Sequence, residues 1–195
     1  MKFSFPLLKA FEDLETEAGC DEAGRGCLAG PVYGAAVILG NTGDWSFLRD
    51  SKKMKPLERE EAAACIEKQA RAWAVCSASP GAIDRINILQ ASIQAIHRAL
   101  ATLAVRPRQI LMDGSYFIPF EDIPHVCLVK GDNRFLAIAA ASILAKVHRD
   151  RFMLQQHDYW PVYGWDRNKG YPTAAHKAAL HAHGPSALHR RSFKW

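Results

Sequence analysis

The chain has 195 residues, 49% of them hydrophobic, which suits a single domain over residues 1–195 with a core of its own. With 25 lysines and arginines against 20 aspartates and glutamates, the net charge of +5 is compatible with an anionic partner but too small to establish one. Five cysteines without C-x-x-C spacing argue against a disulfide framework and a zinc cluster. No apolar run is long enough for a signal peptide or a bilayer span, so we expect a cytoplasmic protein without membrane contact.

Predicted strands and helices alternate through the first half of the chain. The apolar run at 30–39 predicts a buried strand, and the residues leading up to Asp21 are its predicted hairpin partner. Residues 56–70 are rich in helix formers, and 81–104 place apolar side chains at helical spacing. Between these two helices, 71–78 predicts another strand.

Two short strands and two helices are predicted for the rest of the chain. The strands lie in "RQILMDG" at 108–114 and "HVCLVKGD" at 125–132, and each stretch contains an acid next to a glycine. The helices are predicted over 134–157 and 173–183. We therefore expect an α/β fold, a central sheet flanked by helices, with a helical C-terminal portion from about residue 134.

Four carboxylates stand at or near the ends of predicted strands. Asp21 and Glu22 come in "CDEAGRG", Asp113 in "LMDG" and Asp132 in "VKGD". Successive residues of a strand point to opposite faces, so Asp21 and Glu22 are expected to share a site only if the strand finishes there. If the strands are neighbours, the four acids converge and their repulsion raises their pKa values unless cations bind. Hard oxygen ligands indicate Mg²⁺ or Mn²⁺.

An acid beside a glycine can also be a simple turn residue. The stretch "GRG", with Gly24, Arg25 and Gly26, is harder to explain in that way, because a small turn seldom needs a carboxylate pair and an arginine beside bare backbone. A phosphate would use all of these groups, since its oxygens can bridge two metal ions while the glycine amides and the arginine approach a nucleic-acid backbone.

Several motifs together resemble bacterial ribonuclease HII. They are, in chain order, "DEAGRGCLAGPV", "DSKK", "LMDG", "VKGD", "AAASILAKVHRD", "NKGYPT" and "HRRSF", and they extend from about Cys20 to Phe193. The resemblance implies an RNase H-like fold with a mixed five-stranded sheet. It also implies metal-dependent cleavage of the RNA in RNA–DNA hybrids and cleavage 5′ to a lone ribonucleotide in duplex DNA. We expect a monomer with two divalent ions, Mn²⁺ or Mg²⁺, in its site.

The resemblance also assigns roles to individual residues. The catalytic metal ligands it implies are Asp21, Glu22, Asp113 and Asp132. The substrate-binding residues it implies are Gly24, Arg25 and Gly26 as the loop that senses the 2′-hydroxyl, Tyr171 against the sugar at the DNA–RNA junction, and Lys52 and Lys146 near the substrate backbone.

Two other functions remain as alternatives. An RNase H-like DNA nuclease or recombinase would share the acids and metals but would not need to sense a 2′-hydroxyl, and a non-catalytic RNA-binding domain would not need four converging acids. Among the remaining polar residues, His181 and His183 are predicted to lie on a solvated helix face. A further set of basic residues is interpreted as solubilising surface or as phosphate contacts: Lys169, Lys177, Arg190 and Arg191.

Overall fold

A mixed sheet of five strands is the centre of the fold in this computed structural model, which describes residues 10–49, 51 and 54–195. The strands stand in the order β3, β2, β1, β4, β5, and their bounds are β1 Glu17–Ala23, β2 Val32–Ile38, β3 Ala72–Ala78, β4 Gln109–Asp113 and β5 His125–Leu128. β1 is antiparallel to β2 and parallel to β4, which is parallel to β5. The predicted mixed sheet and the β1–β2 hairpin pairing are confirmed.

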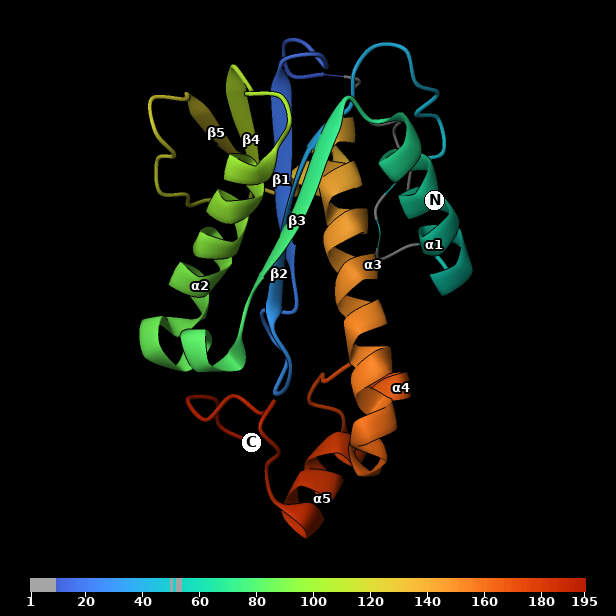
Figure 1. Ribbon diagram of the computed structural model, residues 1–195, viewed down its shortest axis with the longest axis vertical. Helices are drawn as coiled ribbons and strands as arrows, with labels where there is room; N and C mark the ends of the chain where they lie inside the picture. The colour runs from blue at the N-terminus through green and yellow to red at the C-terminus, as the bar shows by residue number, and fades with distance from the viewer. Residues whose placement is uncertain (1–9, 50, 52–53) are drawn as a thin grey trace, which may run out of the picture.

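Helices cover both faces of this sheet, α2 on one side and α3 with α1 on the other (Figure 1). Their bounds are α1 Pro56–Gln69, α2 Pro80–Thr102, α3 Leu136–Tyr159, α4 Trp165–Asn168 and α5 Ala174–His183. The four long helices lie within two residues of their predicted positions. The short helix α4 and the 3₁₀ turns η2 (Gly131–Asn133) and η3 (Pro161–Tyr163) had not been predicted. In the described part of the chain, no helix combines the length and apolarity needed to cross a membrane.

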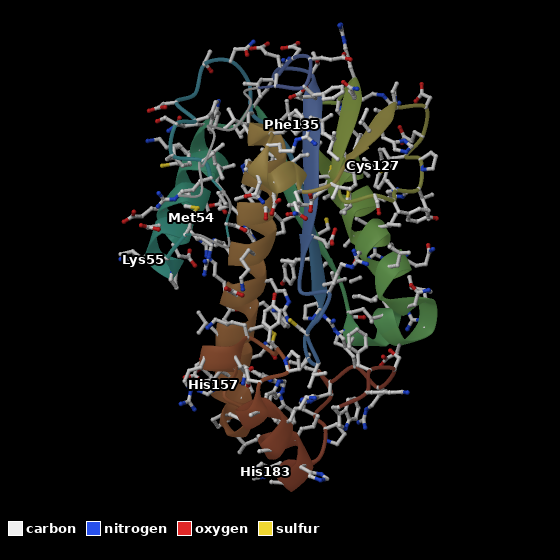
Figure 2. The ribbon with its side chains drawn as sticks, turned by 180° about the vertical axis from the view of Figure 1, so that it is seen from behind. Met54, Lys55, Cys127, Phe135, His157 and His183 are labelled. Carbon is white, nitrogen blue, oxygen red and sulfur yellow. The ribbon has the colours of Figure 1, made fainter. Side chains whose placement is uncertain are left out.

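α3, with 24 residues, is the longest helix in the described part of the chain. Seen from behind in Figure 2, Phe135 marks its beginning near one end, and His183 marks the end of α5 at the other. The helix packs against β1 through buried alanines, among them Ala137 and Ala140. Gly19 of β1 allows this close approach, because a β-carbon there would lie 2.1 Å from the carbonyl carbon of Ala137.

A buried cluster of aromatic rings holds the C-terminal segment beneath the sheet. His176 and His189 are both at most 2% exposed, and their Nε2 atoms are 3.1 Å apart. Tyr163 stacks on Trp165 with ring centroids 5.1 Å apart, and Trp165 Nε1 donates to His176 Nε2. The segment after α5 is therefore fixed by its rings to the turn between α3 and α5.

The hydrogen bonds of this cluster allow one proton arrangement. Ser186 N–H donates to His189 Nδ1, so the neutral His189 carries its proton on Nε2 and donates to His176. His176 Nδ1 lies 2.9 Å from the carbonyl oxygen of Tyr171 and must donate to it. Both imidazoles therefore fit as neutral rings, and an added proton on either would face another donor.

Stability is expected to fall in acid because of these two imidazoles. Burial lowers the pKa of His176. Burial, assisted by repulsion from a protonated His176 and from Arg191, lowers the pKa of His189 to about 4. An unfolded imidazole titrates near pH 6.5. The unfolded chain therefore takes up protons first, so this contribution to stability is complete above about pH 6.5 and is lost as the pH falls toward about 4. Melting temperatures across this range measure the effect.

His189→Gln is the comparison for this measurement, because it keeps a polar side chain that does not titrate. Carboxylates also titrate near the acid end of the range, so the slope of melting temperature against pH must be compared between the two proteins. The variant should have the shallower slope. Equal slopes would show that His189 makes no contribution to the acid sensitivity.

Gly19→Ala is expected to lower the free energy of unfolding by about 3 kcal/mol, because the added methyl group meets rigid helix backbone. Urea denaturation followed by circular dichroism measures the change. Gly81→Ala is the matched control, since a β-carbon there would meet its first neighbour, a side-chain atom of Arg85, at 3.8 Å. A Gly19→Ala protein as stable as wild type would contradict the close packing of β1 on α3.

Candidate functional site

Three acids come together at the C-terminal ends of the ladders that join the parallel strands β1, β4 and β5. The β1–β4 ladder ends at the pair Cys20 and Met112, so the next residues, Asp21 and Asp113, follow side by side. Asp132 reaches the same place from η2, just after β5. Ligand oxygens of the three carboxylates all lie within 4.8 Å of one another. The predicted convergence of acids from three segments is therefore present for Asp21, Asp113 and Asp132.

Hydrogen bonds hold each of these carboxylates in place. Gly131 N–H donates to Asp113 Oδ1 over 2.7 Å, and Asn133 Nδ2 donates to Asp132 Oδ1 over 2.9 Å. Asp21 Oδ1 accepts from the backbone N–H of the next residue, also over 2.7 Å. Asp21 and Asp132 are only 5% and 2% exposed, so two of the three carboxylates are shielded from water.

The buried carboxylate of Asp21 lies among other negative charges, and burial and charge together raise its pKa. Burial first, and then the negative charges of Glu22 and Asp113, raise the pKa of Asp21 well above its ordinary value. A hydrogen bond from Ser142 opposes this shift, and the Ser142 hydroxyl lies 3.0 Å from that of Ser51. A cation among these oxygens would remove the penalty, and carboxylate oxygens suit a hard divalent ion. The residues present therefore fit a divalent metal.

Glu22 lies beside this group rather than within it. It lines a cavity of about 300 Å³ under α2, together with Arg25, Met112 and Asp113. Its carboxylate accepts from Arg25 Nη1 over 3.2 Å. β1 stays paired with β2 as far as Ala23, one residue beyond Glu22, and the turn then begins at Gly24 as expected. The separation of β1 from β4, rather than the end of β1, opens space beside both acids.

The two glycines of the loop after β1 stand in different surroundings. Gly24 has a φ of +96°, and a β-carbon there would lie 2.0 Å from Arg149 Nε. A β-carbon on Gly26 would have no atom within 4 Å in the part of the chain that the structure describes. The side chain of Arg25 between them is 48% exposed. Leu28 N–H donates to Gly170 O over 2.8 Å, which ties this loop to the segment carrying Tyr171.

Tyr171 lies beside two cations on α3. Its side chain is 38% exposed, and its ring centroid is 5.5 Å from Lys146 Nζ and 5.8 Å from the guanidinium carbon of Arg149. Lys146 also pairs with Asp150 over 2.7 Å. The structure thus places predicted residues Lys146 and Tyr171 together. Lys52, the other predicted basic contact, lies outside the described residues.

Sequence reasoning assigned one basic residue wrongly and missed several polar ones. Arg190 is fully buried, so it is neither solubilising surface nor an exposed phosphate contact. Arg149 is buried as well, and the hydroxyls of Ser51 and Ser142 were not singled out. Composition and periodicity contain no signal for them, because their partners are distant in sequence.

The full chain is similar to known ribonucleases. A family model described as Ribonuclease HII matches residues 18–195. Ribonuclease HII of Bacteroides thetaiotaomicron is 53% identical over 177 residues, covering 91% of this chain and 88% of that protein. Ribonuclease HII of Dechloromonas aromatica is 54% identical over 175 residues, covering 90% and 89%.

Solved structures of related enzymes share the fold. RNase HII in the PCNA:RNase HII complex from Archaeoglobus fulgidus aligns with a TM-score of 0.78 at 27% identity, covering 92% of this chain and 96% of that one. Bst-RNase HIII in complex with Mn²⁺ aligns with a TM-score of 0.64 at 18% identity, covering 87% and 70%. The predicted RNase H-like fold is confirmed. With a family model over nearly its whole length and relatives sharing about half of its residues, the chain belongs to the ribonuclease HII family and is a ribonuclease H.

Proposed function

We propose that this ribonuclease H cuts the RNA strand of RNA–DNA hybrids, and duplex DNA 5′ of a single ribonucleotide, with two Mg²⁺ or Mn²⁺ ions held by Asp21, Glu22, Asp113 and Asp132. The observation that carries the proposal is the group of three carboxylates whose ligand oxygens lie within 4.8 Å of one another. When bound, such ions polarise a phosphate oxygen and activate the attacking water. Glu22 and Asp113 line one cavity, which supports a second ion position on that side of β1.

The protein's own contribution to this chemistry is preorganisation. Hydrogen bonds from Gly131 N–H and Asn133 fix the carboxylates of Asp113 and Asp132 before an ion binds. Ser142 does the same for Asp21. Because the ligands are held on the strands β1 and β4 and on a 3₁₀ turn, little side-chain entropy is lost when an ion enters.

Recognition of the ribose is proposed for the loop of residues 24–26 together with Tyr171. A 2′-hydroxyl can be read by backbone groups only where no side chain intervenes, and Gly26 has open space on its β-carbon side. Tyr171, which is 38% exposed, offers a ring to the adjacent sugar. Lys146, next to that ring, supplies positive charge for the substrate backbone.

We also propose that the enzyme acts in the cytoplasm as a monomer built from one domain. All five cysteines are free thiols, as is usual in a reducing compartment. The proposed partners are nucleic acids, namely the RNA–DNA hybrid and ribonucleotide-containing duplex DNA.

The first test removes one metal ligand. Asp21→Asn is expected to slow cleavage of a labelled duplex with a single ribonucleotide by more than about a hundredfold, because the amide keeps the shape but removes the charge that binds the ion. In EDTA the variant should melt at a higher temperature than wild type, because a buried carboxylate with a raised pKa is replaced by a neutral group.

The same variant gives a readout of metal binding that is independent of activity. Mn²⁺ should raise the melting temperature of wild type and should raise that of Asp21→Asn much less. Asp158→Asn, an exposed acid on α3, is the matched control and should behave as wild type in both measurements. Full cleavage in EDTA, or an equal Mn²⁺ effect on both proteins, would overturn the metal site.

The second test concerns Gly26. Gly26→Ala is expected to leave the melting temperature unchanged, because a β-carbon there meets no atom of residues 10–49, 51 and 54–195 within 4 Å. Single-turnover cleavage at a lone ribonucleotide should nevertheless fall by about tenfold or more, because the methyl group stands where the sugar must approach. Gly81→Ala, which also has room for its methyl group, should retain full activity. Wild-type cleavage by Gly26→Ala would exclude the loop from ribose recognition.

A further inference from the structure

Two fully buried arginines, Arg149 and Arg190, lie beneath the loop of residues 24–26. Neither has a role in the chemistry proposed above. Burial lowers the pKa of Arg190 to about 10, so the group still carries its charge at neutral pH. Burying a guanidinium is costly unless its N–H donors have hydrogen-bond partners. The partners of these two arginines therefore indicate their structural role.

Arg190 binds the carbonyl side of the loop. Its Nη2 donates to Gly24 O over 2.7 Å, its Nη1 to Arg25 O over 2.9 Å, and its Nε to Gly30 O over 3.0 Å. Its backbone N–H donates to Leu28 O over 2.9 Å. Arg190, a single residue near the C-terminus, thus donates hydrogen bonds to four carbonyl oxygens of the segment that follows β1.

Arg149 connects the same segment to Tyr171. Its Nη2 donates to Ala29 O over 3.0 Å and its Nε to Pro31 O over 3.1 Å. Its Nη1 donates over 2.8 Å to Lys169 O, two residues before Tyr171, and its guanidinium lies beside the Tyr171 ring. The guanidinium also fills the space that a β-carbon on Gly24 would occupy.

These bonds determine which way the loop amides point. In a planar trans peptide the C=O and the following N–H point in opposite directions. The carbonyl of Gly24 shares a peptide with the N–H of Arg25, and the carbonyl of Arg25 shares one with the N–H of Gly26. Because Arg190 holds both carbonyls, both N–H groups point away from its guanidinium.

We infer that Arg149 and Arg190 are positioning residues that set the orientation of the Arg25 and Gly26 amides, and their placement relative to Tyr171, for reading the ribose 2′-hydroxyl. The inference rests on the proposed role of the loop in ribose recognition. Hydrogen bonds from a charged donor are stronger than neutral ones, so the loop is held against the pull of a bound substrate. A lysine keeps the charge but cannot span carbonyls in the fork geometry of a guanidinium.

The test compares binding with turnover. Arg190→Lys and Arg149→Lys should each slow single-turnover cleavage at a lone ribonucleotide by about tenfold or more, while the Kd for the same duplex changes by less than about threefold. Arg98→Lys is the matched control, because Arg98 also donates to a carbonyl, that of Ser77, but on the exposed surface of α2. It should cleave as wild type does.

A double-mutant cycle separates positioning from a general effect on folding. If Arg190 acts through the loop, adding Arg190→Lys to Gly26→Ala should slow cleavage little further, whereas independent effects would multiply. Rates are measured well below the melting temperature of each protein, with enzyme in excess. Three results would each overturn the inference. The first is that the two substitutions slow cleavage by factors that multiply, and the second is that substrate affinity falls as much as the cleavage rate. The third is that the arginine variants do not fold at any temperature.

The cycle also separates this inference from the proposed function. If Gly26→Ala cleaves as wild type, the loop does not read the ribose and both ideas fail. If Gly26→Ala is slow while Arg190→Lys and Arg149→Lys cleave as wild type, only the positioning role fails.

Discussion

The burial of Asp21 beside other carboxylates is the constraint on which the rest of the structure depends. A carboxylate that is 5% exposed loses most of its hydration, and Glu22 and Asp113 add repulsion. The protein offsets this cost in part by hydrogen bonds from Ser142 and from the backbone of the next residue. The rest is left for a cation, so the repulsion among these carboxylates and their affinity for a metal ion have the same origin.

That constraint explains why α3 is built from small residues where it crosses β1. For Ser142 to reach Asp21, the helix axis must come closer to the strand than larger side chains would allow. Gly19 and Ala137 provide the close approach, with backbone packed almost directly on backbone. Ser51 then extends the hydroxyl chain from Ser142 to the segment before α1.

Most of the secondary structure could be predicted from the sequence because its signals are local: apolar runs bounded by turn residues and apolar spacing of helical period. The break inside α2 could not be predicted from the sequence. Asn87 has a φ of 64° and its side chain accepts from Gln90 N–H, so one residue interrupts a pattern that reads as continuous helix. The buried pair His176 and His189 was missed for another reason, since the neutral state of each ring depends on partners that only the folded chain supplies.

In the site, too, residues with a local sequence signal could be predicted and residues defined by distant contacts could not. The two loop glycines show why. Acids near glycines at predicted strand ends are local signals, so Asp21, Asp113 and Asp132 could be found. Arg190 was assigned to the surface because nothing near it in sequence predicts burial. Gly24 and Gly26 look alike in "GRG", but a β-carbon on the first would collide with an arginine more than a hundred residues away, whereas a β-carbon on the second would have no atom of the described residues within 4 Å. This contrast supports the proposal that the backbone at Gly26 is kept bare for the approach of a substrate.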